Sequence, residues 1–593
     1  MPKRTKKKTI KRKETRRKQR TQRTQTKYSK YLTSDSNKCI NFLNSIKGKG
    51  WNKSLSYSTK LIPQLDTIIN EIMTLYKSVC ENTKVTEFSY LNISQVVGLN
   101  KMDKLANENS DFILNNPKII QLFILINNKH PDVYTKYIRQ FNITPDELTS
   151  FKEFLKTIEN FSKKSPKEQD KMKQEISNYM NENGKKFVRM FSYLIRSKQL
   201  PEDLGSFKEE IYKKDTIYSE FAPMEVQLCA ENKCNNKCVL KANFDDHLLD
   251  LNICSIEQFY ELNNSELNNL QFKLPKNIET AVHRSLLLPA LINSSKQVNI
   301  VIWLCPNKKQ LPEHLFKSTK RQKLILGSKE VNSAATDRQK IAIWRKEEFK
   351  KSIFHESVHY FNLDFHNFPE HKQLYNIFKI NPENEIRVYE SYTELLANIL
   401  NCITSGYEIF LKSSQKHPTT LSDLKKIRNL DFKKIRNLDF KKIRNLVKYF
   451  IKTEQQFSCF QIAKILYHLG YTEFKDFLHY EGKEGNNIKS APQFLLEQTT
   501  PVLSYFIIKG TLLNNIDEFI NQFIFKNNKL NLKFNDNPSN HKLYLDLIIE
   551  SINNPQFVEN VNRCIKFLKT VKKTSTNLFP MKSLRMTCVE VKD

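Results

Sequence analysis

The pentapeptide His355-Glu356-Ser357-Val358-His359 is the stretch that decides the fold. Apolar residues at helical spacing surround it, among them Ile353 and Phe361, and they predict a buried helix at about residues 341–361. Helical side chains four positions apart lie on one face. His355 and His359 could therefore bind one Zn²⁺ together. Glu356 would lie at the edge of that face, where a carboxylate can take a proton from a zinc-bound water without binding the metal.

A catalytic zinc ion needs a third protein ligand. Metzincins take it from the pattern HExxHxxGxxH, which Asn362 and Phe365 break in this chain, and His366 is one position out of register. A second predicted helix, at about residues 385–402, carries Glu390 and Glu394 one turn apart. We expect Glu394 to be the third ligand and keep Glu390 as the alternative. If Glu390 is the ligand, Glu394 becomes the carboxylate that supports the site from outside the ligand set.

The order His355-Glu356-xx-His359, then Glu394-Leu-Leu-Ala397-Asn398, resembles the gluzincin pattern of HExxH followed by ExxA[D/N]. Neprilysin-like, angiotensin-converting-enzyme-like and anthrax-lethal-factor-like peptidases share this pairing. The flanking block from Val331 to His355 and the basic N-terminal tail resemble those of uncharacterised metallopeptidase-like proteins of large DNA viruses. The resemblance extends from about residue 298 to about residue 405.

This resemblance implies a zinc-dependent metallopeptidase, an endopeptidase, with one zinc ion per chain and a protein or peptide substrate. His355, His359 and Glu394 would hold the zinc ion, and Glu356 would be the general base. Several gluzincins have, four residues after the ligand, an Asp that orients a zinc-bound His. Asn398 occupies that place here and can still accept a hydrogen bond. The candidates for stabilising the oxyanion or supporting the site are Tyr389, Tyr392 and His371.

Strand signals are few. Residues 299–304 are β-branched and apolar and end before Pro306, which predicts a strand. Residues 323–326 are a second candidate, and residues 331–336 read as a turn or an edge segment. Within 323–336 we expect an edge strand that pairs with extended substrate. The predicted class is α+β, mostly helical, with a zincin-like core made of a small sheet, the active-site helix and the glutamate helix.

The chain of 593 residues is too long for one core. We divide it into a disordered basic tail (1–30), a helical N-terminal domain (31–215), a mixed connecting region (216–296), the zincin-like catalytic core (297–405), an insertion (406–450) and a helical C-terminal region (451–593). The insertion holds three copies of Lys-Lys-Ile-Arg-Asn-Leu, which begin at Lys425, Lys433 and Lys441. A period of eight rotates equivalent helical positions by about 80° per copy, so we predict a tolerated surface helix or loop. Thr144-Pro145 predicts the start of a helix, with Thr144 as its cap.

The formal net charge is +33, and residues 1–30 hold fifteen Lys and Arg against one acidic residue, Glu14. Such a tail could bind nucleic acid without sequence preference, or another acidic surface. Two further hypotheses therefore stand beside the peptidase. The chain could be a structural or virion-associated protein that keeps a peptidase-derived domain, or a nucleic-acid-associated protein that acts through its tail.

The N-terminus lacks the apolar segment of a signal peptide, and no apolar run is long enough to span a membrane. We expect an intracellular protein that is not secreted, in the virion or in host cytoplasm or nucleus if it is viral. Eleven cysteines, an odd number, favour reduced thiols. Cys229, Cys234 and Cys238 cluster, with His247 and Cys254 nearby, but their spacing differs from the usual Cys-x2-Cys of a zinc site. Reduced thiols are the favoured interpretation, and a structural zinc ion is the alternative.

Overall fold

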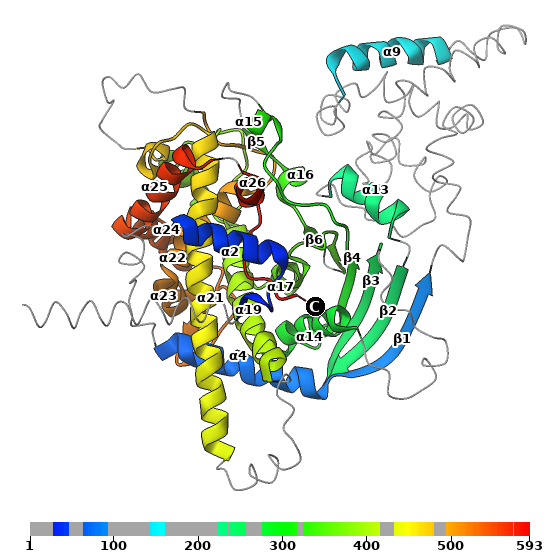
Figure 1. Cartoon of the computed structure of the whole chain (residues 1–593), viewed down its shortest axis with the longest axis vertical. Coiled ribbons are helices and arrows are strands. Elements are labelled where there is room, and N and C mark those ends of the chain that lie inside the picture. The colour runs from blue at the N-terminus through cyan, green and yellow to red at the C-terminus, as the bar shows by residue number, and fades with distance from the viewer. Residues whose placement is uncertain are drawn as a thin grey trace, which may run out of the picture.

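The structure is a computed structural model that describes residues 28–46, 63–92, 143–159, 222–234, 236–256, 275–317, 324–337, 339–414, 432–479, 494–572 and 574–592. Among these residues helices predominate, and a small mixed sheet lies on one side of them (Figure 1). This agrees with the predicted α+β class. Residues 1–27 of the basic tail, most of the predicted N-terminal domain and the first repeat copy lie outside the described residues.

The main sheet has six strands in the order β1-β2-β3-β4-β7-β6. Neighbouring strands are antiparallel from β1 to β3, parallel from β3 to β7, and antiparallel between β7 and β6. The predicted strand at 299–304 is confirmed as β4, and the predicted edge segment contains β6 at the end of the sheet. The bounds are β1 (Lys84–Asn92), β2 (Asn236–Phe244), β3 (His247–Ser255), β4 (Val298–Trp303), β6 (Ala334–Thr336) and β7 (Ile341–Ile343).

Helix α14 (Lys276–Leu291) connects the parallel strands β3 and β4, because parallel neighbours need a crossover. Helix α17 (Phe349–Tyr360) follows β7. The predicted helix at 341–361 is therefore wrong over its first residues. Ile341 and Ile343 are buried on alternate positions of a strand, and the helix begins only after Glu348, whose φ of 62° is left-handed.

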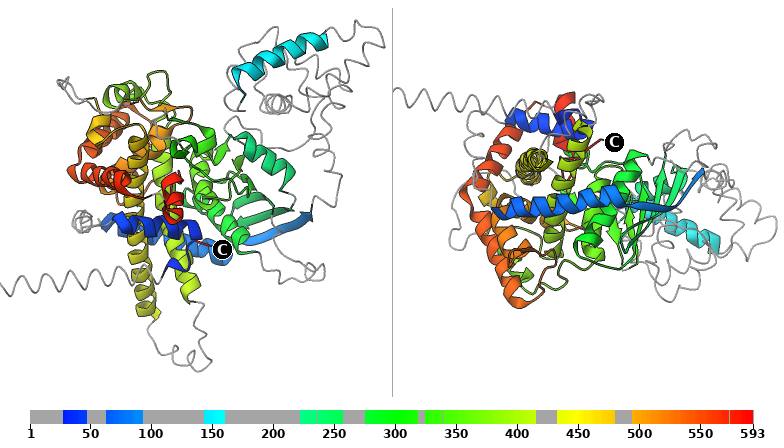
Figure 2. Two further views of the ribbon diagram at one scale, coloured as in Figure 1. Left: turned by 45° about the horizontal axis from the view of Figure 1, so that its top comes forward. Right: turned by 90° about the horizontal axis from the view of Figure 1, so that it is seen from below.

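The helical part is layered against the sheet. Helix α17 contacts β6 and β7 on one side and α19 (Tyr389–Ser414) on the other, and α19 contacts α21 (Phe432–His468) (Figure 1). Helix α4 (Pro63–Asn82) packs against α14, α19 and α21 and leads into β1 (Figure 2). The proposed domain limits near 405 and 450 fall inside α19 and α21.

The third repeat copy lies in α21 and is more than a surface helix. Its Ile443 and Leu446 are buried, whereas Lys441 and Lys442 are exposed. The predicted cap of α9 (Pro145–Glu159) is confirmed, because the Glu147 amide donates to Thr144 Oγ1 at 3.2 Å. None of the described helices is long and apolar enough to span a membrane.

The remaining elements surround this framework. The helices are α2 (Ser34–Ile46), α13 (Met224–Asn232), α15 (His314–Lys317), α16 (Ser328–Val331), α18 (His371–Ile377), η5 (Phe474–Phe477), η6 (Leu503–Ile508), α22 (Lys509–Asn514), α23 (Ile516–Phe519), η7 (Ile520–Ile524), α24 (Pro538–Asn553), α25 (Pro555–Thr570) and α26 (Ser575–Lys582). The short strands are β5 (Ile325–Leu326), β8 (Glu497–Gln498), β9 (Phe525–Lys526) and β10 (Lys529–Leu530). The second predicted strand is thus present as β5, but it pairs with β8 and not with the main sheet.

A buried arginine joins three of the central helices. Arg284 of α14 donates to Glu408 of α19 at 2.9 Å and to the carbonyl of Lys350 of α17 at 3.1 Å, and it is fully buried. Replacing Arg284 with Ala leaves the buried Glu408 without this cation. We expect the free energy of unfolding to fall by about 3–5 kcal/mol in chemical denaturation. Lys276→Ala on the same helix is the control and should have no measurable effect, since Lys276 is exposed. Equal effects of the two variants would contradict this role.

Candidate metal centre

Two helices carry the residues of the candidate site. Helix α17 holds His355 and His359 one turn apart, and α19, packed against it, holds Glu390 and Glu394 one turn apart. His355, Glu390 and Glu394 are buried, and His359 is partly buried. Apolar neighbours such as Phe354 and Leu395 place this part of both helices in the core. Two residues from each helix therefore meet inside the protein.

Glu390 lies against both histidine rings. Its Oε2 atom is 3.3 Å from Nε2 of His355 and 3.2 Å from Nε2 of His359. Ligand atoms of these three side chains all lie within 4.8 Å of one another, so the group could hold a metal ion. The sequence predicted both histidines for this role.

Glu394 lies behind the cluster and not within it. It accepts a hydrogen bond from Nδ1 of His355 at 3.0 Å, on the far side of the ring from Glu390. Two buried lysines face its carboxylate, Lys351 at 2.5 Å and Lys509 at 3.9 Å. The geometry therefore favours Glu390, the alternative in the sequence analysis, as the third ligand. Glu394, four residues later, has the supporting position that the resemblance assigned to Asn398.

Asp364 supports the second histidine in the same way. Its Oδ2 atom lies 2.6 Å from Nδ1 of His359 and also accepts from the hydroxyl of Thr393 at 3.3 Å. The left-handed residue Asn362, with a φ of 49°, turns the chain at the end of α17 and brings Asp364 back. A carboxylate only accepts, so each Nδ1 is the donor, and Nε2 of a neutral ring is left with the lone pair that a metal needs.

Electrostatics in the cluster favour a cation. Burial disfavours protonated rings, but hydrogen bonds to Glu390 and Glu394 raise the pKa of His355. The charge of Glu390 and a hydrogen bond to Asp364 likewise hold the pKa of His359 well above its usual value. Burial would raise the pKa of Glu390, yet the two rings lower it. The carboxylates thus stabilise a positive charge between the two rings. A metal ion can supply that charge in place of the ring protons.

Glu356 lies next to the cluster without joining it. Its Oε1 atom is 3.9 Å from Nε2 of His355, and burial raises its pKa. It borders a cavity of about 30 Å³, enough for a water molecule. His355, Ser333 and Tyr505 also line this cavity. A carboxyl group with a raised pKa beside a cavity of this size is suited to proton transfer.

Comparisons with protein-family models, with curated proteins and with solved structures found no match.

The other predicted residues differ in their position. The ring of Tyr389 lies 5.9 Å from that of His359, so Tyr389 borders the cluster. Tyr392 belongs to the core, where its hydroxyl donates to the carbonyl of Leu532 at 3.0 Å. His371 has Nδ1 2.7 Å from the carbonyl of Phe368, at the start of α18. Asn398 donates to Glu454 at 3.5 Å. Of these four candidates, the structure brings Tyr389 alone to the histidine rings.

Tyr505 borders the site but was not predicted. Its ring, on η6, lies 5.9 Å from the ring of His355. Burial and the charges of Glu390 and Glu356 hold the pKa of its hydroxyl well above the usual value, so this group stays a hydrogen-bond donor. No local motif marks Tyr505, because its place depends on how η6 packs on α19.

Proposed function

We propose that this protein is a zinc-dependent metallopeptidase in which His355, His359 and Glu390 hold one zinc ion. The observation that carries the proposal is that each histidine ring has one carboxylate at its Nε2 atom and a different carboxylate at its Nδ1 atom. Both Nε2 atoms face Glu390, while Glu394 and Asp364 hold the two Nδ1 atoms. Histidine ligands of metals almost always donate their second N–H to such a partner.

The charge balance supports a divalent ion. Four carboxylates lie within 4 Å of the two rings, namely Glu356, Glu390, Glu394 and Asp364. Among the described residues, the ammonium groups in ion-pair contact with this set are Lys351 and Lys509, and both contact Glu394. Buried charge is costly unless it is paired. Two imidazoles and one carboxylate with room for water form a donor set typical of catalytic zinc.

The arrangement of the elements agrees with a zincin-like core of the gluzincin type. An antiparallel edge strand, β6, and the helix α17 lie side by side, and the third ligand comes from a second helix. Strand β6 is the last in the order of the described sheet. An extended peptide could add to its outer edge as a further strand. Residues just before β6, Ser333 among them, line the cavity beside Glu356, so such a peptide would pass the proposed catalytic group.

Each residue has a distinct part in peptide hydrolysis. A zinc ion held by the three ligands would lower the pKa of water and polarise the scissile carbonyl. Glu356 accepts the proton of the attacking water and passes it to the leaving amine. Tyr505 donates a hydrogen bond to the oxygen that becomes negatively charged. Glu394 and Asp364 fix the two rings in orientation and tautomer.

Replacing Tyr505 with Phe tests its part. Loss of one oxyanion donor should lower kcat by about 10²–10³-fold, with little change in KM or in zinc content. Tyr467→Phe is the matched control and should keep the wild-type kcat, because Tyr467 lies on α21 and does not line the cavity. Steady-state kinetics on a peptide substrate measure both variants. Wild-type kcat in Tyr505→Phe would remove this residue from the mechanism.

The function itself is tested with the full-length protein and a broad peptide library. We expect cleavage that a zinc chelator abolishes and added zinc restores. A fully zinc-loaded protein that cleaves no peptide would contradict the proposal and favour the structural or virion-associated alternative. The buried Glu356 favours the enzyme, because a structural domain needs no carboxyl group beside such a cavity. The nucleic-acid alternative rests on the basic tail of residues 1–30, of which residues 1–27 lie outside the described residues.

A further inference from the structure

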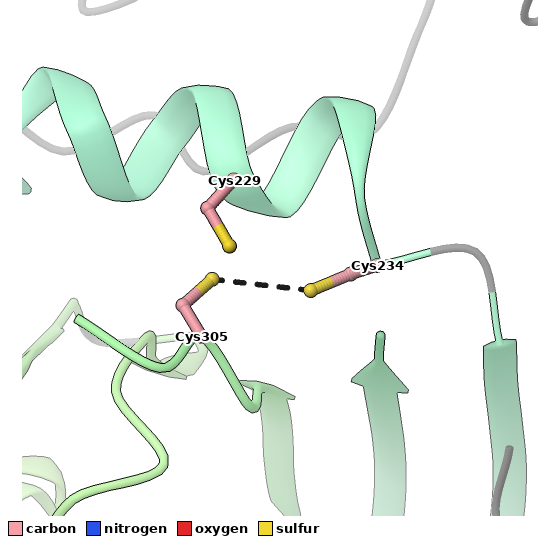
Figure 3. Close-up of side chains that lie close together, drawn as sticks. All are labelled: Cys229, Cys234 and Cys305. Atoms are coloured by element: carbon pink, nitrogen blue, oxygen red, sulfur yellow. Dashed lines mark hydrogen bonds between the residues drawn. The ribbon is translucent and has the colours of Figure 1, made fainter. Parts of the chain in front are cut away.

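A second group of metal-binding side chains lies apart from the histidine cluster. Cys229 on α13, Cys234 just after that helix, and Cys305 in the loop after β4 point toward one another (Figure 3). Their Sγ atoms all lie within 4.8 Å of one another, and those of Cys234 and Cys305 are 3.9 Å apart. All three side chains are buried.

The composition of this group corrects the sequence-based grouping. Cys238 is a residue of β2 and packs in the core of the sheet, so it is not a neighbour of Cys229. His247 is held elsewhere, with Nδ1 2.8 Å from the carbonyl of Ser294. Cys305, 71 residues after Cys234, takes the third place. Spacing along the chain could not show this, because the end of β4 brings Cys305 to α13.

The distances suit a metal ion. Zinc–sulfur bonds of about 2.3 Å place tetrahedral thiolates about 3.8 Å apart. The distance of 3.9 Å between the Sγ atoms of Cys234 and Cys305 already matches, and the Sγ atom of Cys229 lies within 4.8 Å of both. A disulfide would need an S–S distance of about 2.0 Å and would leave the third cysteine unused.

Positive groups near the three cysteines would offset part of the negative charge of bound thiolates. Two cations act on the group electrostatically, Lys233 on Cys229 and the buried Arg345 on Cys305. Arg345 also donates to the carbonyls of Asn332 and Lys329, both at 2.7 Å. These carbonyls belong to the segment that leads into β6. The cysteine group is therefore linked through Arg345 to the edge of the sheet beside the candidate active site.

We propose that Cys229, Cys234 and Cys305 bind a second, structural zinc ion as thiolates. The three thiol protons are released to solvent when the metal binds. Among the described residues no fourth Cys, His, Asp or Glu joins the group, so the fourth coordination position is open to a water molecule. The ion would fasten the short helix α13 to the end of β4. This site stands independently of the histidine cluster.

Metal analysis of the full-length protein tests the proposal. We expect about two zinc ions per wild-type chain, about one in Cys305→Ser and about one in Glu390→Gln. Cobalt in place of zinc should give thiolate-to-metal charge-transfer absorption in wild type and in Glu390→Gln, but not in Cys305→Ser. Cys254→Ser is the matched control, because Cys254 is buried in the same apolar cluster yet is not among the three. It should keep both ions.

X-ray absorption at the zinc edge of wild-type protein gives a result that needs no variant. It should show sulfur neighbours, on average between one and two per zinc ion. Zinc without sulfur neighbours, or Cys305→Ser with the full zinc content, would refute the site. So would a Cys234–Cys305 disulfide in protein purified without oxidant. If Glu390→Gln lost zinc and Cys305→Ser did not, the proposed catalytic site would stand and the proposed cysteine site would be refuted.

Discussion

Replacing Glu356 with Gln should lower kcat/KM for peptide hydrolysis by about 10²–10⁴-fold, the usual contribution of a general base. The amide keeps the shape of the side chain but cannot accept the proton of the attacking water. Zinc content should stay at the wild-type level, because Glu356 lies beside the ligand set and not in it. The measurement is the specificity constant together with the zinc content of the same preparation.

Glu385→Gln serves as the control for this variant. Glu385 precedes α19 and is exposed, and its partner is Arg387. Its activity should equal that of wild type. If Glu356→Gln retained full activity with zinc bound, Glu356 would not be the base, and the proposed mechanism would fail.

The second large effect separates the two glutamates of α19. Glu390→Gln should weaken zinc binding by more than about 100-fold, because it removes the charged group that faces both Nε2 atoms. Asp364→Asn should weaken it by only about 10–100-fold, the usual loss for a supporting partner. Competition with a chelator of known affinity measures both values.

Glu394→Gln should also weaken zinc binding by about 10–100-fold. It leaves the buried Lys351 without its carboxylate, so it should in addition lower the free energy of unfolding by about 3–5 kcal/mol. Among the described residues the ion pairs of Glu390 are with His355 and His359, so Glu390→Gln leaves no buried ammonium group without its carboxylate. Zinc affinity that falls more in Glu394→Gln than in Glu390→Gln, in folded protein, would restore Glu394 as the ligand.

The sequence predicted the pair of helices and the two histidines that the structure brings together. His355 and His359 lie one turn apart, so local periodicity is enough to place them on one face. The same periodicity cannot choose between Glu390 and Glu394, because residues four apart share a face. The choice depends on how far α19 is shifted along α17, which only packing decides.

Other features of the site depend on contacts that no local pattern records. Asp364 reaches His359 through the turn at Asn362, and Tyr505 comes from η6, far along the chain. Local periodicity does not separate the strand β7 from the predicted helix, because the apolar residues of the two elements follow one another closely. Its alternation at Ile341 and Ile343 covers only three residues, too few to distinguish a strand from a helical turn.

Diffraction data collected at the zinc absorption edge from crystals of the full-length protein test the central claim most directly. An anomalous peak should lie between His355, His359 and Glu390, at about 2.0–2.1 Å from the two Nε2 atoms. Glu394 should stay on the Nδ1 side of His355, outside bonding distance of the metal. A zinc-soaked crystal with no peak there, or with a peak bonded to Glu394, would contradict the account.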